Sequence, residues 1–557
     1  MAAADMNPAT AFPAWYSPET GVYHSTHPSV PFPESTFLDA VSYIISHTHD
    51  GLNAFVDSSS GFSVSYSELL PLVKSMACGL RRLGVSRGDV VLLLLPNSVY
   101  YPVVFLGILY LGGVVTTMNP LSSPLEIRRQ IAECGVRLAF ASPERFREVE
   151  NLGVSVVAVP ETGNVGPDRV EFSSFYGLIS NSSGADLDSV AKPLIRQDDT
   201  AAIVYSSGTT GGSKGVVLTH RNLIAMVELF VKFEASQYDF LSTENVYLAS
   251  LPMFHIYGLS LFVLGLLALG SQVVVMRRFN PGDAVRAIDK YQVTHFPVVP
   301  PILKALTRAA QSAEGSTSLK SLKQVSCGAA TLHRRAIEEF VQALPHADFI
   351  QGYGMTESTA VGTRGFNSEK FQKYSSIGLL APNMQAKVVD WKTGSFLPPG
   401  VSGELLLRGP AIMKGYLNNA EATMLTIDED GWLHTGDIIH FDHDGFLHIL
   451  DRLKEIIKYK GFQIAPADLE AVLITHPEIM DVAVTGTVDE ECGEVPVAFV
   501  VRKNGSALSQ EGVINFVAKQ VTPYKKVRKV VFTNLIPKSP AGKILRRELK
   551  KLLASRL

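Results

Sequence analysis

The sequence predicts an α/β protein with a large N-terminal domain of parallel-sheet α/β subdomains, a small β-barrel-like unit and a small α+β C-terminal domain. Helix-like and strand-like runs alternate over residues 36–140 and again from Thr200 to about Asn367, a pattern typical of parallel sheets. Short strands separated by turns fill Ile377–Ile449, which predicts a small barrel or distorted sheet. We expect domains at 1–451 and 452–557, with 377–450 as the β-rich part of the first.

The individual elements follow from apolar periodicity. In the first block, helical spacing at Ser67–Leu83 and Tyr100–Leu111 alternates with apolar strands at Asp89–Leu94 and Gly113–Thr117. Residues 160–197 are rich in Gly, Ser and Pro and predict a surface connection. The strands of the β-rich unit are "AKVVD", "GELLLRG" and "FLHILD". In the last domain we expect helices at Asp468–His476, near Glu511–Val521 and at the basic C-terminus, and strands at Asp481–Gly486, Val495–Arg502 and Arg528–Asn534.

Composition excludes several classes of protein. The net charge of −3 over 557 residues provides no basic surface for nucleic acid. Four scattered cysteines without a CxxC pair argue against a zinc site or a disulfide scaffold and for a reducing compartment. The apolar stretches Val90–Pro120 and Leu259–Met276 are interrupted by Pro, Gly and polar residues. We therefore interpret them as buried strand and helix units of the core, and predict no membrane span.

The two ends of the chain bear on its location. The N-terminal stretch lacks the basic and apolar regions of a signal peptide. The chain ends in Ser555-Arg556-Leu557, which resembles the peroxisomal Ser-Lys-Leu address. We expect import into the peroxisome through a receptor that reads this tripeptide, or a cytoplasmic location if it is not read. The alternative is that these residues are only the end of a basic helix.

A glycine loop is the first candidate site. "SSGTTGGSKG" (206–215) follows the apolar run "TAAIVY" and precedes a second strand at Val216–Leu218. Such a loop cannot pack a core, but its N–H groups, hydroxyls and Lys214 can converge on an anion. It is not a Walker A loop, because Ser213 precedes the lysine. A plain hairpin is the alternative. Thr219 is expected to cap the helix that begins "HRNLIAM".

Four further motifs occur in a fixed order after the loop: "QGYGMTES" (351–358), "HTGD" (434–437), "DRLKEIIKYKGFQIAPADLE" (451–470) and "PKSPAGKILRREL" (537–549). Together the five motifs resemble those of the adenylate-forming superfamily of acyl-CoA synthetases, luciferases and adenylation domains. The resemblance covers nearly the whole chain and is strongest to plant 4-coumarate–CoA ligase-like proteins, including peroxisomal ones. It implies an AMP-binding N-terminal domain and a mobile C-terminal domain with a hinge near Lys454.

The resemblance implies an ATP-dependent carboxylate–CoA ligase. A carboxylate would attack the α-phosphate of ATP to give an acyl adenylate and pyrophosphate, and the CoA thiol would then release AMP. Lys543 would reach both anions in the first step; the alternative is a lysine that lies on the surface of a basic helix. Glu357 would bind Mg²⁺, or is merely an acid at a helix start. The residues implied for ATP and AMP are Ser206, Ser207, Gly208, Thr209, Thr210, Lys214, Gln351, Gly352, Tyr353, Thr356, Asp437, Arg452, Lys454, Gln463 and Lys543.

Thioester formation would use a second face of the C-terminal domain. By resemblance Lys458 acts in this step, while Lys460 and Gly461 contact CoA, with Arg278 as a further CoA candidate. A solvated basic strand edge is the alternative reading of "KEIIKYK".

The resemblance places the acyl group near "PMFHIYG" (252–258), where His255 would gate the pocket, unless it is a satisfied core histidine, and Tyr257 would line it. Ala329 and Gly352 would line it as well, beside the small apolar residues Val298, Val299, Cys327 and Gly328.

Departures from 4-coumarate–CoA ligases leave the acid open. "GELLLRG" replaces their usual "GEICIRG", "GLSL" after Tyr257 lacks their asparagine, and Gly212-Ser213 replaces Leu-Pro. Cinnamate-type, fatty and jasmonate-precursor acids therefore remain candidates, in phenylpropanoid or fatty acid metabolism. A luciferase-like oxygenase and a non-catalytic nucleotide-binding relative are the competing functions.

Overall fold

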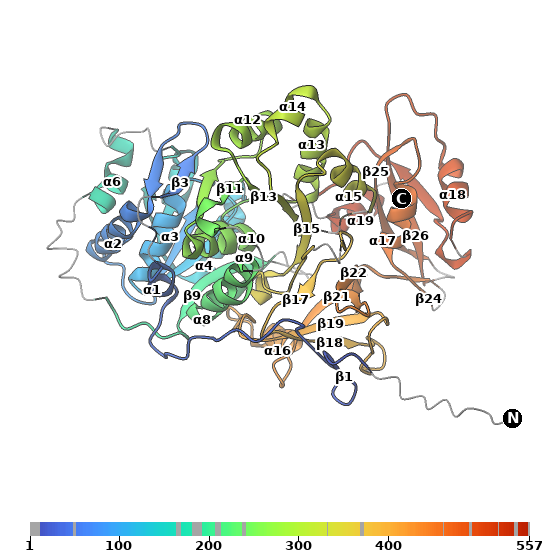
Figure 1. Ribbon diagram of the computed structural model, residues 1–557, viewed down its shortest axis with the longest axis horizontal. Helices are drawn as coiled ribbons and strands as arrows, with labels where there is room; N and C mark the ends of the chain where they lie inside the picture. Colours follow the sequence, from blue (N-terminus) through green and yellow to red (C-terminus); the bar gives the residue numbers. More distant parts are fainter. Residues whose placement is uncertain are drawn as a thin grey trace.

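The computed structural model describes residues 12–47, 49, 52–162, 169–180, 192–206, 213–236, 241–330, 332, 334–367, 372–459, 462–489, 493–521, 523–539 and 544–554. Its β-strands form four sheets. Two large sheets and their helices make up one end and the middle of the molecule, a third sheet lies below them in Figure 1, and the C-terminal unit lies at the other end.

The first large sheet has seven strands in the order β20-β10-β9-β6-β5-β7-β8. Its central pairs are parallel, as the alternating sequence predicted, while β9 and β10 form an antiparallel hairpin. The strands are β5 (Val90–Leu94), β6 (Val114–Thr117), β7 (Val136–Ala141), β8 (Ser155–Ala158), β9 (Thr200–Ser206), β10 (Lys214–Thr219) and β20 (Gly415–Tyr416). The associated helices are α2 (Tyr66–Arg82), α3 (Tyr100–Tyr110), α4 (Pro124–Cys134), α5 (Pro143–Glu150) and α8 (His220–Met226).

The described part of residues 160–197 contains more than the expected surface connection. It includes helix α6 (Ser173–Ser180), whose Phe175 and Leu178 are buried. A Cβ atom at Gly79 on α2 would lie 2.8 Å from the Leu178 Cα, so the glycine permits the two helices to pack closely. The apolar residues of α6 span too few turns for periodicity to reveal a helix among Gly and Ser.

The second large sheet has nine strands in the order β17-β16-β15-β14-β13-β11-β12-β3-β4. Its core strands β3 and β11 to β15 are parallel, so their carboxyl ends meet at one edge. The strands are β3 (Asn53–Asp57), β4 (Ser63–Ser65), β11 (Val246–Ala249), β12 (Gln272–Val275), β13 (His295–Val298), β14 (Gln324–Cys327), β15 (Asp348–Tyr353), β16 (Thr363–Arg364) and β17 (Leu379–Leu380).

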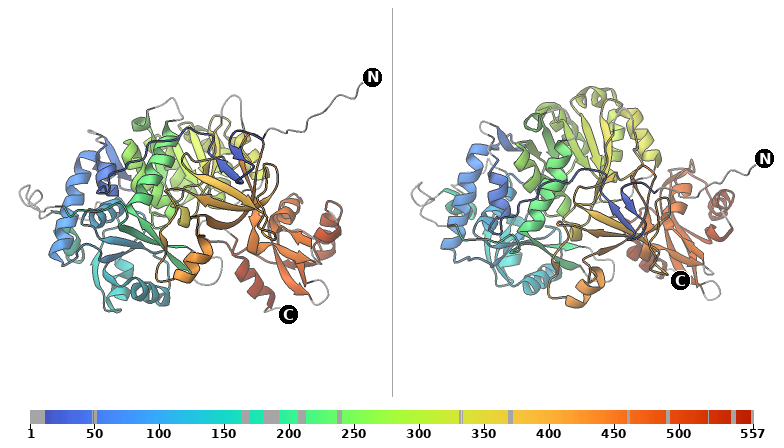
Figure 2. Two further views of the ribbon diagram at one scale, coloured as in Figure 1. Left: turned by 90° about the horizontal axis from the view of Figure 1, so that it is seen from below. Right: turned by 60° about the horizontal axis from the view of Figure 1, so that its bottom comes forward.

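Helices cover this second sheet and join it to the first (Figure 2). They include two π-helical segments, which continue the helices α8 and α10. The elements are α1 (Ala40–Ile45), η2 (Val227–Lys232), α9 (Phe233–Ala235), α10 (Ile256–Gly258), η4 (Leu259–Gly265), α11 (Leu266–Leu269), α12 (Pro281–Tyr291), α13 (Pro300–Ala310), α14 (Ala313–Ser318) and α15 (Arg334–Ala343). The apolar stretch Val90–Pro120 forms β5, α3 and β6, the stretch Leu259–Met276 forms η4, α11 and β12, and both are largely buried. Within the described ranges, no helix has the length and apolar character needed to cross a membrane.

The β-rich unit is a six-stranded sheet in the order β1-β2-β18-β19-β21-β22. It is an open sheet that ends at β1 and β22, and its described strands do not close into a barrel. Its two N-terminal strands were not predicted. Strand β2 pairs with β18, more than 350 residues later in the chain, and β1 pairs with β2. The stacked rings of Tyr23 and Phe441, 4.3 Å apart, help to hold them there. The elements are β1 (Tyr16–Ser17), β2 (Val22–His24), β18 (Gln385–Val389), β19 (Gly403–Arg408), β21 (Leu433–Phe441), β22 (Leu447–Arg452) and helix α16 (Ala420–Thr426).

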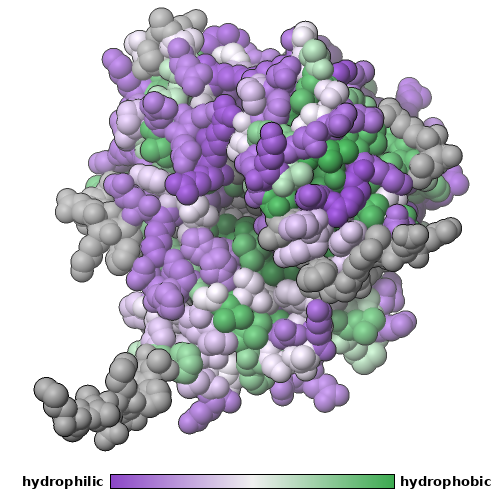
Figure 3. Space-filling view, turned by 90° about the vertical axis from the view of Figure 1, so that its right-hand side faces the viewer, coloured by the Kyte–Doolittle hydropathy of each residue, from purple (hydrophilic) through white to green (hydrophobic). Residues whose placement is uncertain are grey.

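The C-terminal unit has its own sheet and two apolar clusters on it. Its five strands are β23 (Ile457–Tyr459), β24 (Phe462–Ile464), β25 (Ile479–Asp489), β26 (Gly493–Arg502) and β27 (Lys529–Phe532), and its helices are α17 (Pro466–Leu473), α18 (Gln510–Ala518) and α19 (Arg546–Ala554). Hydrophobic and hydrophilic residues are interspersed on this side of the molecule (Figure 3).

The bounds of these elements confirm the strands and helices predicted after Asp451. The hinge near Lys454 stays a prediction.

Candidate functional site

Tyr353, Asp437 and Arg452 form a cluster between two sheets, in which Asp437 is fully buried and the other two are partly buried. Tyr353 ends β15, and its hydroxyl donates to Asp437 Oδ2 over 2.6 Å. Asp437 on β21 lies directly opposite Arg452 on β22, and the Arg452 Nε lies 2.8 Å from Asp437 Oδ1. The Asp437 side chain is 0 % exposed, so its charge is held by these two partners in place of water. The cluster brings together three of the motifs, and Tyr353 and Asp437 are 84 residues apart in the sequence.

The electrostatics of this cluster keep its tyrosine protonated. Burial raises the pKa of Tyr353, and the charge of Asp437 raises it further. Burial lowers the pKa of Arg452, but Asp437 and the other negative groups around it together outweigh burial, and the net shift of the pKa is upward. The tyrosine therefore remains a hydrogen-bond donor and the arginine a cation at neutral pH.

Glu357 lies in a short 3-10 helix, η5 (Thr356–Ser358), directly after the β15 strand and its glycine turn. The side chain is buried and Oε1 accepts a 2.9 Å hydrogen bond from the Tyr416 hydroxyl. The Lys214 ammonium lies 4.7 Å from the centre of the Tyr416 ring. Tyr416 thus links the acid to the end of the glycine loop, a role that the sequence did not indicate.

Backbone geometry around η5 is tightly constrained. Thr359 and Ala360 adopt left-handed φ angles of 52° and 63°. A Cβ atom at Gly354 would meet the Ala360 carbonyl oxygen at 2.1 Å, so this position accepts only glycine. Strain of this kind often persists at binding sites, where the surrounding structure enforces it.

The glycine loop joins the ends of β9 and β10, where Ser206 and Lys214 face each other across the hairpin. Ser213 donates to the Ser206 carbonyl over 2.9 Å. The Ser206 hydroxyl is buried and has no hydrogen-bond partner in the part of the chain that the structure describes. Thr219 caps α8 as predicted. Ser207, Gly208, Thr209 and Thr210 lie outside the described residues.

The predicted acyl-pocket residues meet at the carboxyl ends of β14 and β15. The Tyr257 ring lies 3.5 Å from the position of a Cβ atom at Gly328, and that Cβ would lie 3.3 Å from the Gly352 carbonyl oxygen. Ser326 hydrogen-bonds the Tyr257 side chain, whose pKa is raised by burial. Ala329 follows Gly328 with a φ of 68° and is exposed.

His255 and Gln351 hold local backbone in this region. The His255 Nδ1 accepts from the Tyr257 N–H over 3.4 Å at the start of α10, and burial lowers the pKa of the imidazole, so it is neutral at pH 7. Gln351 donates to the Tyr374 carbonyl over 2.7 Å. Arg278 is exposed just after β12, away from these contacts.

The C-terminal candidates are placed only by their backbone. Lys458 on β23 is the register partner of Gln463 on β24, and Lys454 lies in the 3-10 turn η6 (Leu453–Glu455). Lys460, Gly461 and Lys543 lie outside the described residues, as do the side chains of Lys454, Lys458 and Gln463.

Within the described ranges, no three His, Cys, Asp or Glu side chains gather into a protein-only metal site. A single buried carboxylate such as Glu357 still suits Mg²⁺, which binds few protein ligands and keeps phosphate oxygens and waters.

Comparison with known proteins identifies two family models on this chain. The model described as AMP-binding enzyme matches residues 46–417, and the model described as AMP-binding enzyme C-terminal domain matches residues 468–543. Among the similar proteins, the chain is 62% identical over 544 residues to 4-coumarate–CoA ligase-like 6 of Arabidopsis thaliana, covering 98% of this chain and 95% of the relative. It is 43% identical to the peroxisomal OPC-8:0-CoA ligase 1 of the same plant, with 96% of each chain covered.

Solved structures agree with this similarity. ATP-bound MatB from Rhodopseudomonas palustris superposes with a TM-score of 0.83 at 25% identity, over 92% of this chain and 99% of the other. The o-succinylbenzoate CoA synthetase MenE from Bacillus subtilis, in complex with its acyl-adenylate intermediate, gives a TM-score of 0.78 at 25% identity over 92% and 98% of the two chains.

Proposed function

This chain belongs to the AMP-binding enzyme family, and we propose that it is an ATP-dependent, AMP-forming carboxylate–CoA ligase. A carboxylate attacks the ATP α-phosphorus, forming an acyl–phosphate bond and releasing pyrophosphate. The CoA sulfur then attacks the acyl carbon and releases AMP. The Tyr353–Asp437–Arg452 cluster is the observation that most supports this reaction, because it joins residues of three of the motifs around one carboxylate.

The nucleotide would bind beside this cluster. Asp437 would accept hydrogen bonds from the ribose hydroxyls after a shift of the side chains that now cover it, and Arg452 would add a second contact to the ribose or phosphate. The Tyr353 ring stacks on adenine while its hydroxyl stays on Asp437, with Gln351, Gly352 and Thr356 beside it. The distances within the cluster support this assignment, because the acid is oriented before the ligand arrives.

The triphosphate would lie on the glycine loop. Lys214 and the buried Ser206 hydroxyl, which has no partner among the described residues, support this role at the two ends of the loop, and Ser207, Gly208, Thr209 and Thr210 would supply further donors. Glu357 would hold Mg²⁺ through the oxygen not bonded to Tyr416. The ion supplies charge neutralisation between phosphate groups.

Adenylation brings an anion toward a polyanion, so positioning and charge neutralisation dominate its barrier. One ammonium about 4 Å away, at an effective dielectric of about 20, contributes on the order of 4 kcal/mol. Lys543 would supply this charge to the carboxylate and the α-phosphate.

Thioester formation would follow a rotation of the C-terminal domain, residues 452–557, about a hinge near Lys454. This motion would remove the Lys543 segment from the proposed site and would bring in the face of the domain that carries Lys458, Lys460, Gly461 and Gln463. Lys460 and Gly461 contact CoA, and Arg278 binds a CoA phosphate. The short η6 turn between two sheets supports a hinge at this place.

The acid would lie in the pocket of Tyr257, Gly352 and Ala329, with His255 at its entrance. The contact between Tyr257 and Gly328 supports a narrow apolar slot for a ring or chain. Relatives named for 4-coumarate and for OPC-8:0 point to a cinnamate-type, fatty or jasmonate-precursor acid. The C-terminal Ser-Arg-Leu, together with one relative named as peroxisomal, supports import by a peroxisomal receptor.

An acid-panel assay tests the function. Purified protein receives ATP, Mg²⁺, CoA and one acid at a time, and AMP and acyl-CoA mass are followed together. Equal amounts of AMP and acyl-CoA support the ligase. Light or CO₂ release without acyl-CoA would instead support a luciferase-like oxygenase, and binding of ATP without turnover of any acid would support a non-catalytic relative.

A further inference from the structure

Strand β19 carries an acid that contacts the turn in front of Asp437. The Glu404 Oε1 accepts a hydrogen bond from the Gly436 N–H over 3.2 Å, and its Oε2 lies 3.5 Å from the His434 Nδ1. The Glu404 side chain is 13 % exposed, and its hydrogen bond to His434 raises the pKa of that imidazole. Both contacts of this acid therefore reach the "HTGD" motif, although Glu404 lies outside it.

The contacted turn is a bulge in the pairing of β19 with β21. The register pairs on either side of it are Glu404 with Ile438 and Leu406 with His434. Between these pairs, one residue of β19 lies opposite residues 435–437 of β21. A bulge bends its strand and redirects a side chain, and bulges often occur beside functional sites. Here the redirected side chain is that of Asp437, which meets Tyr353.

The shape of this bulge depends on side chains that accept from its main chain. Gly436 has a φ of 67°, and a Cβ atom placed there would have no described atom within 4 Å apart from its chain neighbours. The backbone conformation, and not a lack of space, therefore favours glycine. The Thr435 hydroxyl accepts from the Asp437 N–H over 3.1 Å and donates to the Leu405 carbonyl over 2.7 Å. Glu404 supplies an acceptor for the Gly436 N–H, where the bulge interrupts the regular ladder.

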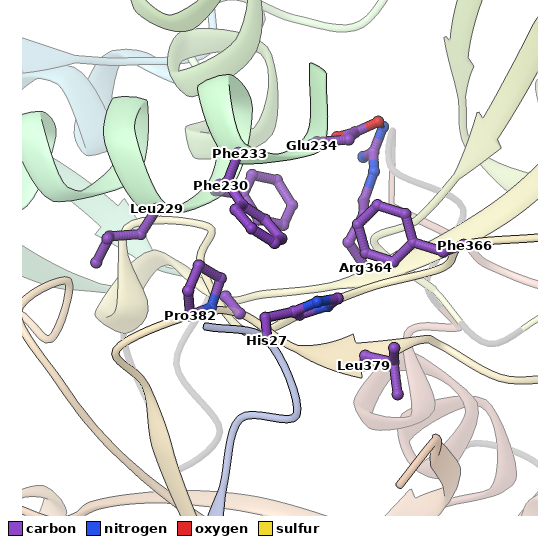
Figure 4. Close-up of a pocket in the computed structure, with 10 residues that line it drawn as sticks. His27, Leu229, Phe230, Phe233, Glu234, Arg364, Phe366, Leu379 and Pro382 are labelled. Carbon is purple, nitrogen blue, oxygen red and sulfur yellow. Dashed lines mark hydrogen bonds and ion pairs between the residues drawn. The ribbon is translucent and has the colours of Figure 1, made fainter. Parts of the chain in front are cut away.

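Glu234 offers a contrast, because its charge is held by a partner of opposite sign. It accepts from Arg364 over 2.6 Å, and the two side chains are 12 % and 7 % exposed. Figure 4 shows this pair beside a cavity with about 10 Å³ open to a water-sized sphere, which is room for about one water. Glu404 contacts a main-chain N–H and a half-exposed imidazole instead, so its charge acts on the turn itself.

We propose that Glu404 is a positioning residue of the ligase, which holds the bulge in the shape that directs the Asp437 carboxylate toward the ribose of the nucleotide. This inference rests on the proposed function. His434 orients the Glu404 carboxylate through one oxygen, and the other oxygen fixes the Gly436 N–H. Without this acceptor the glycine can adopt other backbone conformations, and Asp437 loses its orientation. Ribose is remote from the reacting phosphorus, so the nucleotide binds more weakly while the chemical step is retained.

Measurements of ATP affinity and of turnover test this role together. Titration calorimetry gives the Kd for ATP, and acid-dependent pyrophosphate exchange gives kcat and the KM for ATP. In Glu404→Leu we expect Kd and KM to rise about tenfold, while kcat changes by less than about twofold. Glu404→Gln keeps an oxygen that can accept from the Gly436 N–H, and it should restore the Kd to within about threefold of the unmodified protein.

The matched control is Glu68→Leu. Glu68 accepts from the Ser65 N–H over 2.8 Å at the start of α2, outside the proposed site. This variant loses a similar hydrogen bond and should keep the ATP affinity of the unmodified protein. A merely structural role of Glu404 would lower the Tm of Glu404→Leu and leave its Kd for ATP unchanged.

An unchanged Kd in a folded Glu404→Leu variant would overturn the proposal, as would a loss confined to kcat or an equal loss of affinity in Glu404→Gln. If Glu404→Leu does not fold, Glu404→Asp replaces it. Its shorter side chain withdraws the carboxylate from the Gly436 N–H, so the Kd should rise at least about threefold, and no change counts against the proposal. ATP binding without acid-dependent exchange would refute the ligase function instead, whereas exchange with an unchanged Kd in Glu404→Leu refutes only this inference.

Discussion

Tyr353 and Asp437 lie on different sheets, and the hydroxyl of one donates to the carboxylate of the other over 2.6 Å. The bond fixes the acid in a place where its charge has no access to water. If Asp437 binds ribose, Tyr353 affects nucleotide affinity in two ways. Its hydroxyl orients the Asp437 carboxylate, and its ring stacks on the adenine.

The variant Tyr353→Phe should therefore raise the KM for ATP about tenfold, because a hydrogen bond to a charged group contributes about 1.5–3 kcal/mol. Asp437→Asn should raise it more. The matched control is Tyr23→Phe, which removes a 2.7 Å hydrogen bond to the Leu397 carbonyl outside the site. Steady-state kinetics at varied ATP check the prediction. An equal effect of the two Tyr→Phe changes would show that the Tyr353 bond serves stability alone.

Tyr416 should control the use of magnesium. Removing its hydroxyl with Tyr416→Phe frees the Glu357 Oε1 and lets the carboxylate turn away from its position. We expect the Mg²⁺ concentration for half-maximal adenylation to rise severalfold, with little change in the KM for the acid. Tyr205→Phe is the control, because it removes a similar 2.8 Å bond to Glu133. An unchanged magnesium requirement would remove Glu357 from the proposed metal site.

Lys543→Ala and Lys460→Ala should separate the two half-reactions. Loss of the Lys543 charge should lower the rate of adenylate formation about a thousandfold, since about 4 kcal/mol of charge stabilisation is removed. Conversion of a supplied acyl adenylate to thioester should stay largely intact. Lys460→Ala should show the reverse pattern. Single-turnover assays of each half-reaction provide the measurement, and parallel losses in both variants would contradict the two-face proposal.

A buried glutamate should make stability of the C-terminal unit depend on pH. Glu470 pairs with Arg546 at 2.7 Å and accepts from the Val484 N–H, but burial raises its pKa from 4.5 to about 7. Between these two values the folded chain holds a proton that the unfolded chain has released. Stability is therefore lost as the pH rises through this window, by at most about 3 kcal/mol.

Glu470→Gln should remove this dependence. Its free energy of unfolding should fall less between pH 4.5 and 8 than that of the unmodified protein, as measured by denaturant titrations at several pH values. Glu548→Gln, which changes an exposed acid on α19 that pairs with Lys551, is the control. Identical pH slopes for Glu470→Gln and the unmodified protein would contradict the assignment.

The sequence predicts the elements of the large sheets well because their apolar runs are long and bounded by turns. Strand β5 and helix α3 fall within one residue of the expected limits at each end. The N-terminal strands β1 and β2 were missed, because two or three residues give no periodicity and β18, the partner of β2, is far away in the sequence. The aromatic residues on both sides of the "PETG" turn were the available signal.

The candidate site could be predicted only where a motif carried it. Tyr353, Glu357 and Asp437 lie in motifs, and the structure brings the first and last into contact. Tyr416 lies in no motif, and its importance arises from a partner, Glu357, that only folding brings to it. A lone Tyr in a strand has too many alternative roles for its neighbours in sequence to decide.

Exchange of labelled pyrophosphate into ATP tests the ligase proposal most directly, because it requires a reversible acyl adenylate and does not require CoA. With Mg²⁺ and a panel of cinnamate-type, fatty and jasmonate-precursor acids, we expect exchange that depends on at least one acid and is lost in Lys543→Ala. No acid-dependent exchange from a folded protein that binds ATP would contradict the proposed chemistry.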